Sequence, residues 1–281
     1  MADYIGIKGG KVQNFSTNPP VPIAGQVWYN ETTATINYLA SNPAGTWASG
    51  GNLNDARAHL AGSGNGTQTA TIVFGGAYDR TDNTESYDGT SWTEVNNLNA
   101  SRYGHAGAGT ATAALCFGGH NEATPADLDV NEIWNGTNWT EVADLNTVKR
   151  YAGGNGTSTS ALAVGGYDGT SNLANVETWN GTAWTEGDSL NTARAYDLAA
   201  FGTSTSAIHA GGDSGPGNRA LSEEWDGSSW TEVGDLSTAI RYTVGGGTTS
   251  AGIQAGGLDS NDSVVTQEWT QASAAVTFTS S

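Results

Sequence analysis

Short apolar runs alternate along most of the chain with polar stretches rich in glycine, serine, threonine and asparagine. One unit of this pattern predicts four short strands, at residues 151–155, 161–164, 175–179 and 183–186. Gly156 follows the first strand, and Asn180-Gly181 separates the last two as a tight hairpin turn, because both residues readily adopt positive φ. The unit therefore predicts a small antiparallel sheet whose second strand ends at Gly165-Gly166.

The same unit recurs through the chain with a nearly constant period. Gly-Gly follows an apolar run five times, at intervals of 43 to 47 residues: Gly75-Gly76, Gly118-Gly119, Gly165-Gly166, Gly211-Gly212 and Gly256-Gly257. A tryptophan recurs at similar spacing: Trp47, Trp92, Trp139, Trp184 and Trp230. Two markers that share one period indicate an internal structural repeat.

Such a repeat predicts an all-β propeller. One small sheet cannot bury both of its faces, whereas sheets stacked around an axis cover one another. We expect the Gly-Gly pairs where strands crowd near the axis, and the tryptophans as apolar plates between blades. The units predict five four-stranded blades, at residues 53–95, 98–142, 145–187, 190–233 and 236–278.

The ends of the repeat region leave the blade count open. The last outer strand, Ala275-Val276-Thr277-Phe278, lacks the tryptophan of the other units. Residues 35–49 look like an extra third-and-fourth strand pair, which would either close the ring against the last blade or lie outside it. Five blades is the prediction, and six blades, one of them built from both termini, is the alternative.

The combined pattern resembles the kelch repeat over residues 51–281. The likeness rests on the apolar run, Gly-Gly, a polar loop, an aromatic residue ending the third strand, a tryptophan in the fourth and Leu-Asn-x-x-Arg in the crossover to the next unit. Kelch repeats usually carry tyrosine at the end of the third strand. Here the residues at that position are Tyr87, Trp134, Trp179, Trp225 and Trp269.

Residues 1–50 differ in character and predict a short N-terminal β arm. Residues 8–22 are polar and contain Pro19-Pro20 and Pro22, which discourage regular strand. The string from Gly25 to Asn30 then resembles a β-meander of tailed-phage virion proteins. That resemblance implies an arm that docks on other virion proteins through Trp28 and Tyr29. The alternative is an ordinary aromatic strand that caps the propeller.

Composition and charge narrow the range of partners. Ten Trp, ten Tyr and five Phe among 281 residues argue against a disordered chain, although 40 residues are glycine. The net charge of −18, with ten Lys and Arg residues, disfavours binding to nucleic acid or to anionic membranes. The single cysteine, Cys116, excludes an intramolecular disulfide and is expected in the core. No signal peptide or membrane-spanning segment is predicted.

The sequence contains no arrangement typical of catalysis. Metal-ligand spacing, a nucleophile elbow and a phosphate loop are all missing. His59 and His105 are expected to be framework variants, His209 a core or channel residue, and His120 exposed. Oxygen-rich loops at residues 79–83 and 259–262 are interpreted as solvated turns rather than calcium sites. The repeated outer-strand glutamates are expected to be solvated edge charges: Glu94, Glu141, Glu186 and Glu232. We therefore predict no enzyme, catalytic residue, metal or cofactor.

One face of the propeller is the predicted binding surface. The loop after Gly-Gly varies between units, and the kelch resemblance places it beside the crossover on the face that the family uses for ligands. Tyrosines and arginines there suit a sugar, a carboxylate or a peptide loop. The predicted contact residues are Tyr78, Asp79, Tyr103, His120, Tyr151, Tyr167, Asp168, Tyr196, Asp213, Tyr242 and Asp259. For the crossover arginines, the alternative is that each holds its crossover by pairing with a local carboxylate or carbonyl: Arg57, Arg102, Arg150, Arg194 and Arg241.

These features favour a non-enzymatic phage virion component, such as a tail fibre, appendage or decoration protein. It would be assembled in the host cytoplasm, contact other virion proteins through its arm and bind a host-surface glycan or another virion protein through the propeller. The first alternative is a free lectin-like or protein-binding propeller. The second is a polysaccharide hydrolase or lyase, which would need an acid pair such as Asp213 with a neighbouring glutamate.

Overall fold

The computed structural model describes residues 13–16, 27–38, 49–77, 82–196, 198–215, 217–259 and 262–271. None of these residues is helical, and the structured segments are strands joined by turns. The chain divides into two compact units, residues 1–49 and residues 50–281.

The N-terminal unit contains a three-stranded sheet. β2 (Val27–Asn30) and β3 (Thr35–Tyr38) form an antiparallel hairpin, and β1 (Gln13–Phe15) runs parallel to β2. The Asn30 side chain holds the hairpin turn by accepting hydrogen bonds from the backbone N–H of Thr32 and Thr33, at 3.0 and 3.1 Å. Residues 35–38 therefore belong to this N-terminal sheet. They do not begin the extra blade that the six-blade alternative required. Residues 39–48 lie outside the described part of the chain.

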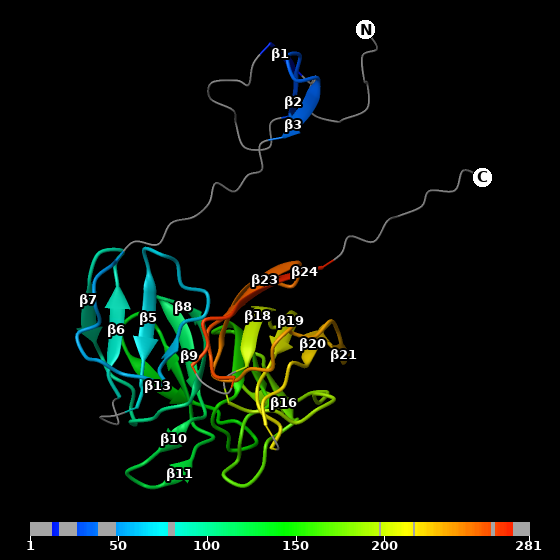
Figure 1. The fold of residues 1–281 in the computed structure, drawn as a ribbon. Helices are drawn as coiled ribbons and strands as arrows, with labels where there is room; N and C mark the ends of the chain where they lie inside the picture. Colours follow the sequence, from blue (N-terminus) through cyan, green and yellow to red (C-terminus); the bar gives the residue numbers. More distant parts are fainter. Residues whose placement is uncertain are drawn as a thin grey trace. The chain divides into compact units, whose positions relative to one another are not determined.

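The larger unit is a β-propeller of five antiparallel sheets, which confirms the predicted fold and blade count (Figure 1). The first blade contains β4 (Ala61–Gly62), β5 (Thr71–Phe74), β6 (Thr84–Tyr87) and β7 (Trp92–Val95). The second contains β8 (Ala106–Thr110), β9 (Ala113–Phe117), β12 (Asn131–Trp134) and β13 (Trp139–Val142). A small hairpin, β10 (His120–Asn121) and β11 (Ala126–Asp127), extends from the loop after β9.

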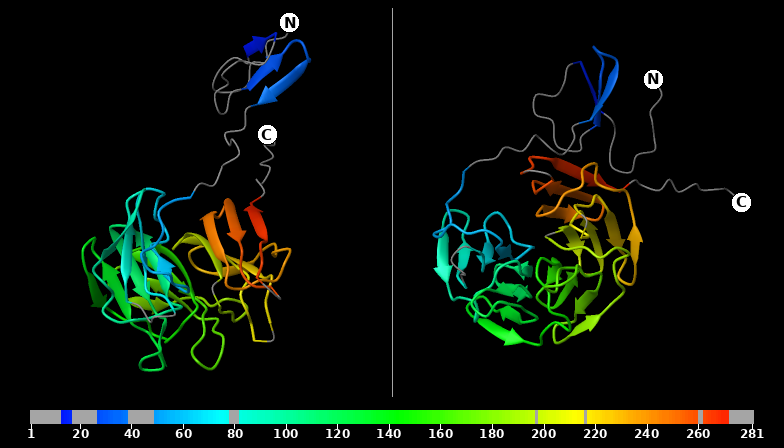
Figure 2. Two further views of the ribbon diagram at one scale, coloured as in Figure 1. Left: turned by 60° about the vertical axis from the view of Figure 1, so that its left-hand side comes forward. Right: turned by 60° about the horizontal axis from the view of Figure 1, so that its bottom comes forward.

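The remaining blades follow the same order around the ring (Figure 2). The third contains β14 (Gly153–Thr157), β15 (Ser160–Val164), β16 (Val176–Trp179) and β17 (Trp184–Glu186). The fourth contains β18 (Ala199–Thr203), β19 (Ser206–Ala210), β20 (Ser222–Trp225) and β21 (Trp230–Glu232). The fifth shows three strands among the described residues, β22 (Val244–Thr248), β23 (Ala251–Ala255) and β24 (Thr266–Thr270). Its predicted outer strand at residues 275–278 lies outside the described range.

The core lies between the blades. Successive residues of a second strand point to opposite faces of its sheet. Leu162 and Val164 of β15 accordingly pack in one cluster with the fourth blade, while Ala161 and Ala163 pack in another with the second. Trp184 lies edge-on to Phe117 of the second blade, with ring centroids 4.9 Å apart. The predicted role of the tryptophans as plates between blades is thus confirmed for the interior junctions.

Cys116 is fully buried in the cluster between the first and second blades, as predicted. Burial raises the pKa of its thiol to about 12, because the thiolate would lose its hydration. The outer-strand glutamates are exposed, which agrees with their interpretation as solvated edge charges.

The Gly-Gly pairs serve a different contact from the one predicted. Gly165 has φ of +62°, and a Cβ there would lie 2.5 Å from the carbonyl oxygen of Arg194, in the crossover that leads into the next blade. The neighbouring Gly166 donates its N–H to that same oxygen at 2.9 Å. The crowding therefore comes from the backbone of the following blade. The Gly-Gly pairs of the first four blades each bond to the next blade in this way, whereas a Cβ at Gly256 in the fifth blade would meet no atom closer than 3.9 Å.

The fifth blade is less covered than the others. Ile253 on β23 is 43% exposed, whereas Ile208, at the equivalent place on β19, is 1% exposed. Val244 and Val264 of the same blade are also exposed. Within the described residues, the fifth blade packs against the fourth through β22 and β18.

Candidate ligand-binding face

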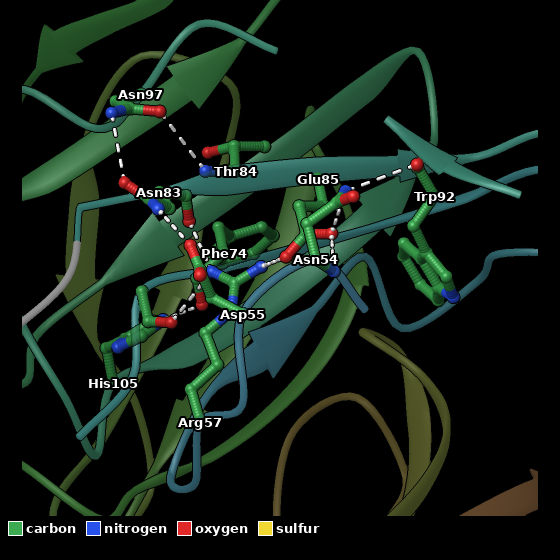
Figure 3. A network of polar contacts seen from close by, with 11 residues as sticks. Asn54, Asp55, Arg57, Phe74, Asn83, Thr84, Glu85, Trp92, Asn97 and His105 are labelled. Atoms are coloured by element: carbon green, nitrogen blue, oxygen red, sulfur yellow. Dashed lines mark hydrogen bonds and ion pairs between the residues drawn. The ribbon is translucent and has the colours of Figure 1, made fainter. Parts of the chain in front are cut away.

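Each of the first four blades contains a buried ion pair between its crossover and its third strand. In the first blade, Arg57 Nη2 lies 2.5 Å from Glu85 Oε1, and Nη1 donates to the carbonyl oxygens of Gly75 and Asn83 (Figure 3). Asn54 donates both its backbone N–H and its side-chain Nδ2 to Glu85 Oε2, each at 2.8 Å. The crossover is thereby attached to the sheet at several points.

Burial alone would raise the pKa of the Glu85 carboxyl. The hydrogen bonds from Asn54 and the charge of Arg57 outweigh that effect and hold its pKa below the usual range. The carboxylate is therefore charged at neutral pH, as an ion pair requires.

The same ion pair recurs in the next three blades. It joins Arg102 to Glu132, Lys149 to Glu177 at 3.2 Å and Arg194 to Glu223 at 2.8 Å. Each carboxylate also accepts from the asparagine of the Leu-Asn motif: Asn99, Asn146 and Asn191. The alternative in which crossover arginines hold their crossovers is thus confirmed for Arg57, Arg102 and Arg194.

The fifth blade replaces the whole charged set by neutral residues. Ile240 stands at the cation position, Gln267 at the carboxylate position and Ser237 at the asparagine position. Ser237 donates its N–H and Oγ–H to Gln267 Oε1, at 2.6 and 2.8 Å. The fifth blade thus lacks both the cation and the anion of the other blades. This is expected because a single buried charge without its partner would be destabilising.

Arg150 and Arg241 belong to a different register from the other crossover arginines. They lie one residue after the buried cation position, at a position whose backbone pairs with the residue following Gly-Gly. Arg150 there pairs with Asp127 at 3.0 Å, and Arg241 with Asp213 at 2.7 Å. Both guanidinium groups are partly exposed on one surface, so the sequence prediction of five equivalent arginines is wrong. We call this surface, formed by the crossovers and the loops after Gly-Gly, the loop face.

The next position in each crossover has a left-handed backbone. Its occupants are His59, Gly104, Tyr151, Tyr196 and Tyr242, with φ between +52° and +70°. This conformation costs about 1–2 kcal/mol for a residue other than glycine. A Cβ at Gly104 would lie 2.7 Å from the ring of Tyr151, so this one glycine leaves room for its neighbour's side chain.

These rings meet in one aromatic cluster drawn from all five blades. It consists of His59, Tyr103, Tyr151, Tyr196 and Tyr242, and the ring centroids in contact are 5.2 to 6.3 Å apart. Backbone bonds run between neighbouring blades here, such as Tyr151 N–H to Gly104 O at 2.6 Å. Arg150 lies over Tyr151 and Tyr167, and Arg241 over Tyr196 and Tyr242, at 5.1 to 5.7 Å. The cluster gives the loop face a rigid aromatic centre.

A cavity of about 560 Å³ opens beside this cluster, where loops of the third, fourth and fifth blades meet. Such a volume falls in the usual range for small-molecule sites. Its lining combines two tyrosines, one ion pair and several small polar residues: Tyr167, Thr170, Ser171, Asn172, Ala193, Tyr196, Asp213, Ser214, Gly215 and Arg241. The cavity therefore combines polar and aromatic lining groups.

The predicted contact residues are distributed unevenly. Tyr167, Tyr196 and Asp213 line the cavity, while Tyr103, Tyr151 and Tyr242 belong to the aromatic cluster. Asp168 caps its own turn by accepting from the N–H of Thr170 and Ser171, and these hydrogen bonds lower the pKa of its carboxyl. Asp259 is exposed in the fifth-blade loop, and Tyr78 and Asp79 lie outside the described residues. Trp28 and Tyr29 lie on β2 of the N-terminal unit.

His120 is less exposed than predicted. Its side chain is 15% exposed, and Nδ1 lies 2.6 Å from Asp127 Oδ1 and 2.8 Å from Arg150 Nη1. The three side chains fill the junction between the second and third blades on the loop face. Asp127 and Arg241 were not among the predicted contacts. Aligning the crossovers on the buried cation would have distinguished Arg150 and Arg241 from the other three crossover arginines.

His105 and His209 are buried framework residues, whereas His59 is exposed and belongs to the aromatic cluster. The prediction of a shared framework role for His59 and His105 is therefore wrong. Nε2 of His209 lies 2.5 Å from Asn155 Oδ1, and Nε2 of His105 lies 3.1 Å from Phe74 O. Nδ1 of each ring is buried without a partner. Burial, with a smaller contribution from nearby arginines, lowers the pKa of both histidines to about 3.

These two histidines predict an acid-sensitive fold. Each takes up a proton near pH 6.5 when unfolded but only near pH 3 when folded, so stability is full above pH 6.5 and falls as the pH drops toward 3. Between pH 7.5 and pH 5 we expect a loss of about 2 kcal/mol per histidine. Urea unfolding followed by tryptophan fluorescence at both pH values measures it.

The variant His209→Gln separates this effect from the titration of carboxyl groups. It should reduce the pH dependence between pH 7.5 and pH 5 by about half, whatever its effect on stability at pH 7.5. An unchanged pH dependence in this variant would show that His209 is not the group responsible.

Within the described residues, no group of three or more His, Cys, Asp or Glu side chains is placed to hold a metal ion. The same part of the chain contains no helix able to cross a membrane. No protein-family model matches the sequence, and a search of curated proteins found no match.

Proposed function

We propose that this protein is a non-enzymatic recognition component of a phage particle, whose propeller binds a host-surface glycan through the loop face. The observation that carries the proposal is the cavity of about 560 Å³ on that face. Aromatic rings beside fixed polar groups are the usual composition of a small-molecule site.

The framework beneath the cavity supports a binding role. The four buried ion pairs attach the crossovers of the first four blades to their sheets, and Gly166 and its equivalents join each of these blades to the next. Groups held in this way lose little conformational entropy when a ligand binds, which favours affinity. The charged side chains at the cavity, Asp213 and Arg241, bond to each other, an arrangement that suits recognition rather than proton transfer.

The virion part of the proposal rests on the N-terminal arm. Its Gly25–Asn30 string resembles a segment of tailed-phage virion proteins, and residues 1–49 form a compact unit separate from the propeller. An arm that docks and a propeller that binds would place the two roles in two units.

One experiment tests both roles. Full-length protein and a form lacking residues 1–50 are incubated with phage particles that lack the protein, and separately with immobilised host-surface polysaccharides. We expect particles to capture only the full-length protein and polysaccharide to bind both forms equally. Equal melting temperatures would show that the truncated propeller remains folded.

Two results would overturn the proposal in different ways. Glycan binding without particle capture by either form would leave a free lectin-like propeller. Particle capture without binding to any polysaccharide would make the loop face a contact for another virion protein.

A further inference from the structure

We propose that the cavity bounded by Tyr167, Tyr196 and the Arg241–Asp213 pair binds one neutral sugar ring of an uncharged glycan. This inference rests on the proposed function and specifies the site and the ligand class. It follows from the aromatic wall, the polar wall and the charge balance of the cavity.

The aromatic wall is rigid. The rings of Tyr167 and Tyr196 have centroids 6.0 Å apart with planes inclined by 33°. Tyr196 also stacks on Tyr151, with centroids 5.2 Å apart and planes inclined by 26°. Its backbone adopts φ of +70°, a conformation that is costly for tyrosine and that directs it into the cluster. Arg150 lies over the Tyr167 ring and Arg241 over the Tyr196 ring. The two rings therefore offer the C–H groups of a sugar a fixed apolar border of the cavity rather than a free stacking face.

The polar wall offers donors and acceptors side by side. Asp213 Oδ2 accepts from Arg241 Nη1 at 2.7 Å, and Asp213 Oδ1 accepts from Gly215 N–H at 2.7 Å. Each carboxylate oxygen keeps a further lone pair, and the guanidinium keeps further N–H groups. A sugar hydroxyl both donates and accepts, so adjacent hydroxyls can bond to the carboxylate and the guanidinium together.

The charge balance favours a neutral ligand. Among the described residues that line the cavity, Arg241 is the only cationic side chain, and it is already paired with Asp213. Arg219 donates to the hydroxyl of the lining residue Ser214. The chain carries a net charge of −18, which repels anions at a distance. A uronic or sialic acid would have to compete with Asp213 for Arg241, whereas an uncharged sugar would not.

A second Arg–Asp pair on the loop face differs from the pair at the cavity. Arg150 pairs with Asp127 beside Tyr151 and Tyr167, but His120 lies within 2.8 Å of both partners. That side chain fills the place that a hydroxyl would take. In the fourth blade the residue equivalent to His120 is Asp213 itself, so among the described residues no histidine at that position bonds to both Arg241 and its carboxylate partner.

The chain provides a matched pair of variants to test the site. Asp168-Gly169-Thr170-Ser171 at the cavity and Asp88-Gly89-Thr90-Ser91 on the outer edge of the first blade have the same sequence and the same aspartate-capped turn. Thr170 and Thr90 are both exposed. Thr170→Trp should fill the cavity, whereas Thr90→Trp adds the same bulk elsewhere. Tyr167→Ala removes part of the aromatic wall as a second, independent variant.

Full-length protein and the three variants are titrated with length-matched neutral hexose oligosaccharides and uronic-acid oligosaccharides. We expect the unmodified protein to prefer the neutral series, Thr170→Trp and Tyr167→Ala to raise the dissociation constant at least about tenfold, and Thr90→Trp to leave it within about twofold. Neutral glycan binding that Thr170→Trp leaves unchanged, or preference for the uronic acids, would overturn this inference and leave the proposed function standing. Failure of the unmodified protein to bind either series or any host polysaccharide would overturn both.

Discussion

The variant Arg194→Ile should lower the free energy of unfolding by about 3–5 kcal/mol, because it leaves the Glu223 carboxylate buried without its cation. Both side chains are almost completely buried, and Arg194 also donates to the carbonyl oxygens of Gly211 and Leu221. When Arg194 is removed, no water can reach the buried Glu223 carboxylate to replace it. The acceptors that Arg194 bonded to are also left without this donor. Urea unfolding at neutral pH, followed by tryptophan fluorescence, measures the loss.

The fifth blade suggests the rescue. Adding Glu223→Gln to Arg194→Ile recreates the neutral combination of Ile240 and Gln267, with Asn191 still able to donate to the new amide. The double variant should recover most of the loss, since replacing a buried ion pair by packed neutral groups is often close to neutral. Additive effects of the two substitutions in a double-mutant cycle would show that the pair does not act as a unit.

The variant Gly165→Ala should destabilise the propeller by about 3–4 kcal/mol, through strain and through a clash between blades. Its φ of +62° disfavours alanine, and the new Cβ would lie 2.5 Å from the carbonyl oxygen of Arg194. That oxygen also accepts the N–H of Gly166, so relieving the clash would weaken a hydrogen bond between the third and fourth blades. The change in melting temperature and in the urea midpoint measures it.

Gly256→Ala is the matched control, because it imposes the same strain without the clash. Gly256 has φ of +64° at the equivalent place in the fifth blade, and the nearest atom to its Cβ position is 3.9 Å away. Gly256→Ala should lower the free energy of unfolding by about 1–2 kcal/mol, because the left-handed backbone conformation is unfavourable for alanine. Equal losses in the two variants would mean that contact between blades contributes nothing at Gly165.

The two sets of contacts also explain how the loop face keeps its shape. The residues at the cavity lie on crossovers and loops, segments that are usually mobile. Here the ion pairs attach the first four crossovers to their third strands, and the Gly-Gly backbone attaches the second to fifth crossovers to the preceding blade. Arg194, which stabilises the fourth blade, lies two residues before Tyr196 at the cavity, so its loss should disturb the aromatic wall as well as the fold.

The sequence was sufficient to predict the architecture because the repeat is defined by residues close together in the chain. Apolar runs, turn residues and the period of Gly-Gly and Trp are short-range features, and they predicted five blades, tryptophan plates and a buried Cys116. The kelch resemblance also predicted that the loops carrying Tyr167 and Asp213 lie on the same face as the crossover carrying Tyr196.

The sequence contained the register within the crossover but not its consequence. Spacing from the Leu-Asn motif places Lys149, and not Arg150, at the position of the other crossover arginines, and it places Arg241 one residue after that position. Burial of this position depends on Glu177, which is far away in sequence and whose charge is tolerated only beside a cation. Only the tertiary structure showed that Arg150 and Arg241 pair instead with Asp127 and Asp213.

The sequence by itself determined the repeat and the fold class, because these follow from periodicity and turn preference. The expectation that the variable loops share one face came from the resemblance to kelch repeats. Only the tertiary structure decided where that face is open. His120 closes the junction of the second and third blades, whereas the junction at Asp213 and Arg241 stays open, and this difference arises from side chains of separate blades packed in three dimensions. A local pattern cannot encode whether two distant side chains fill the same space.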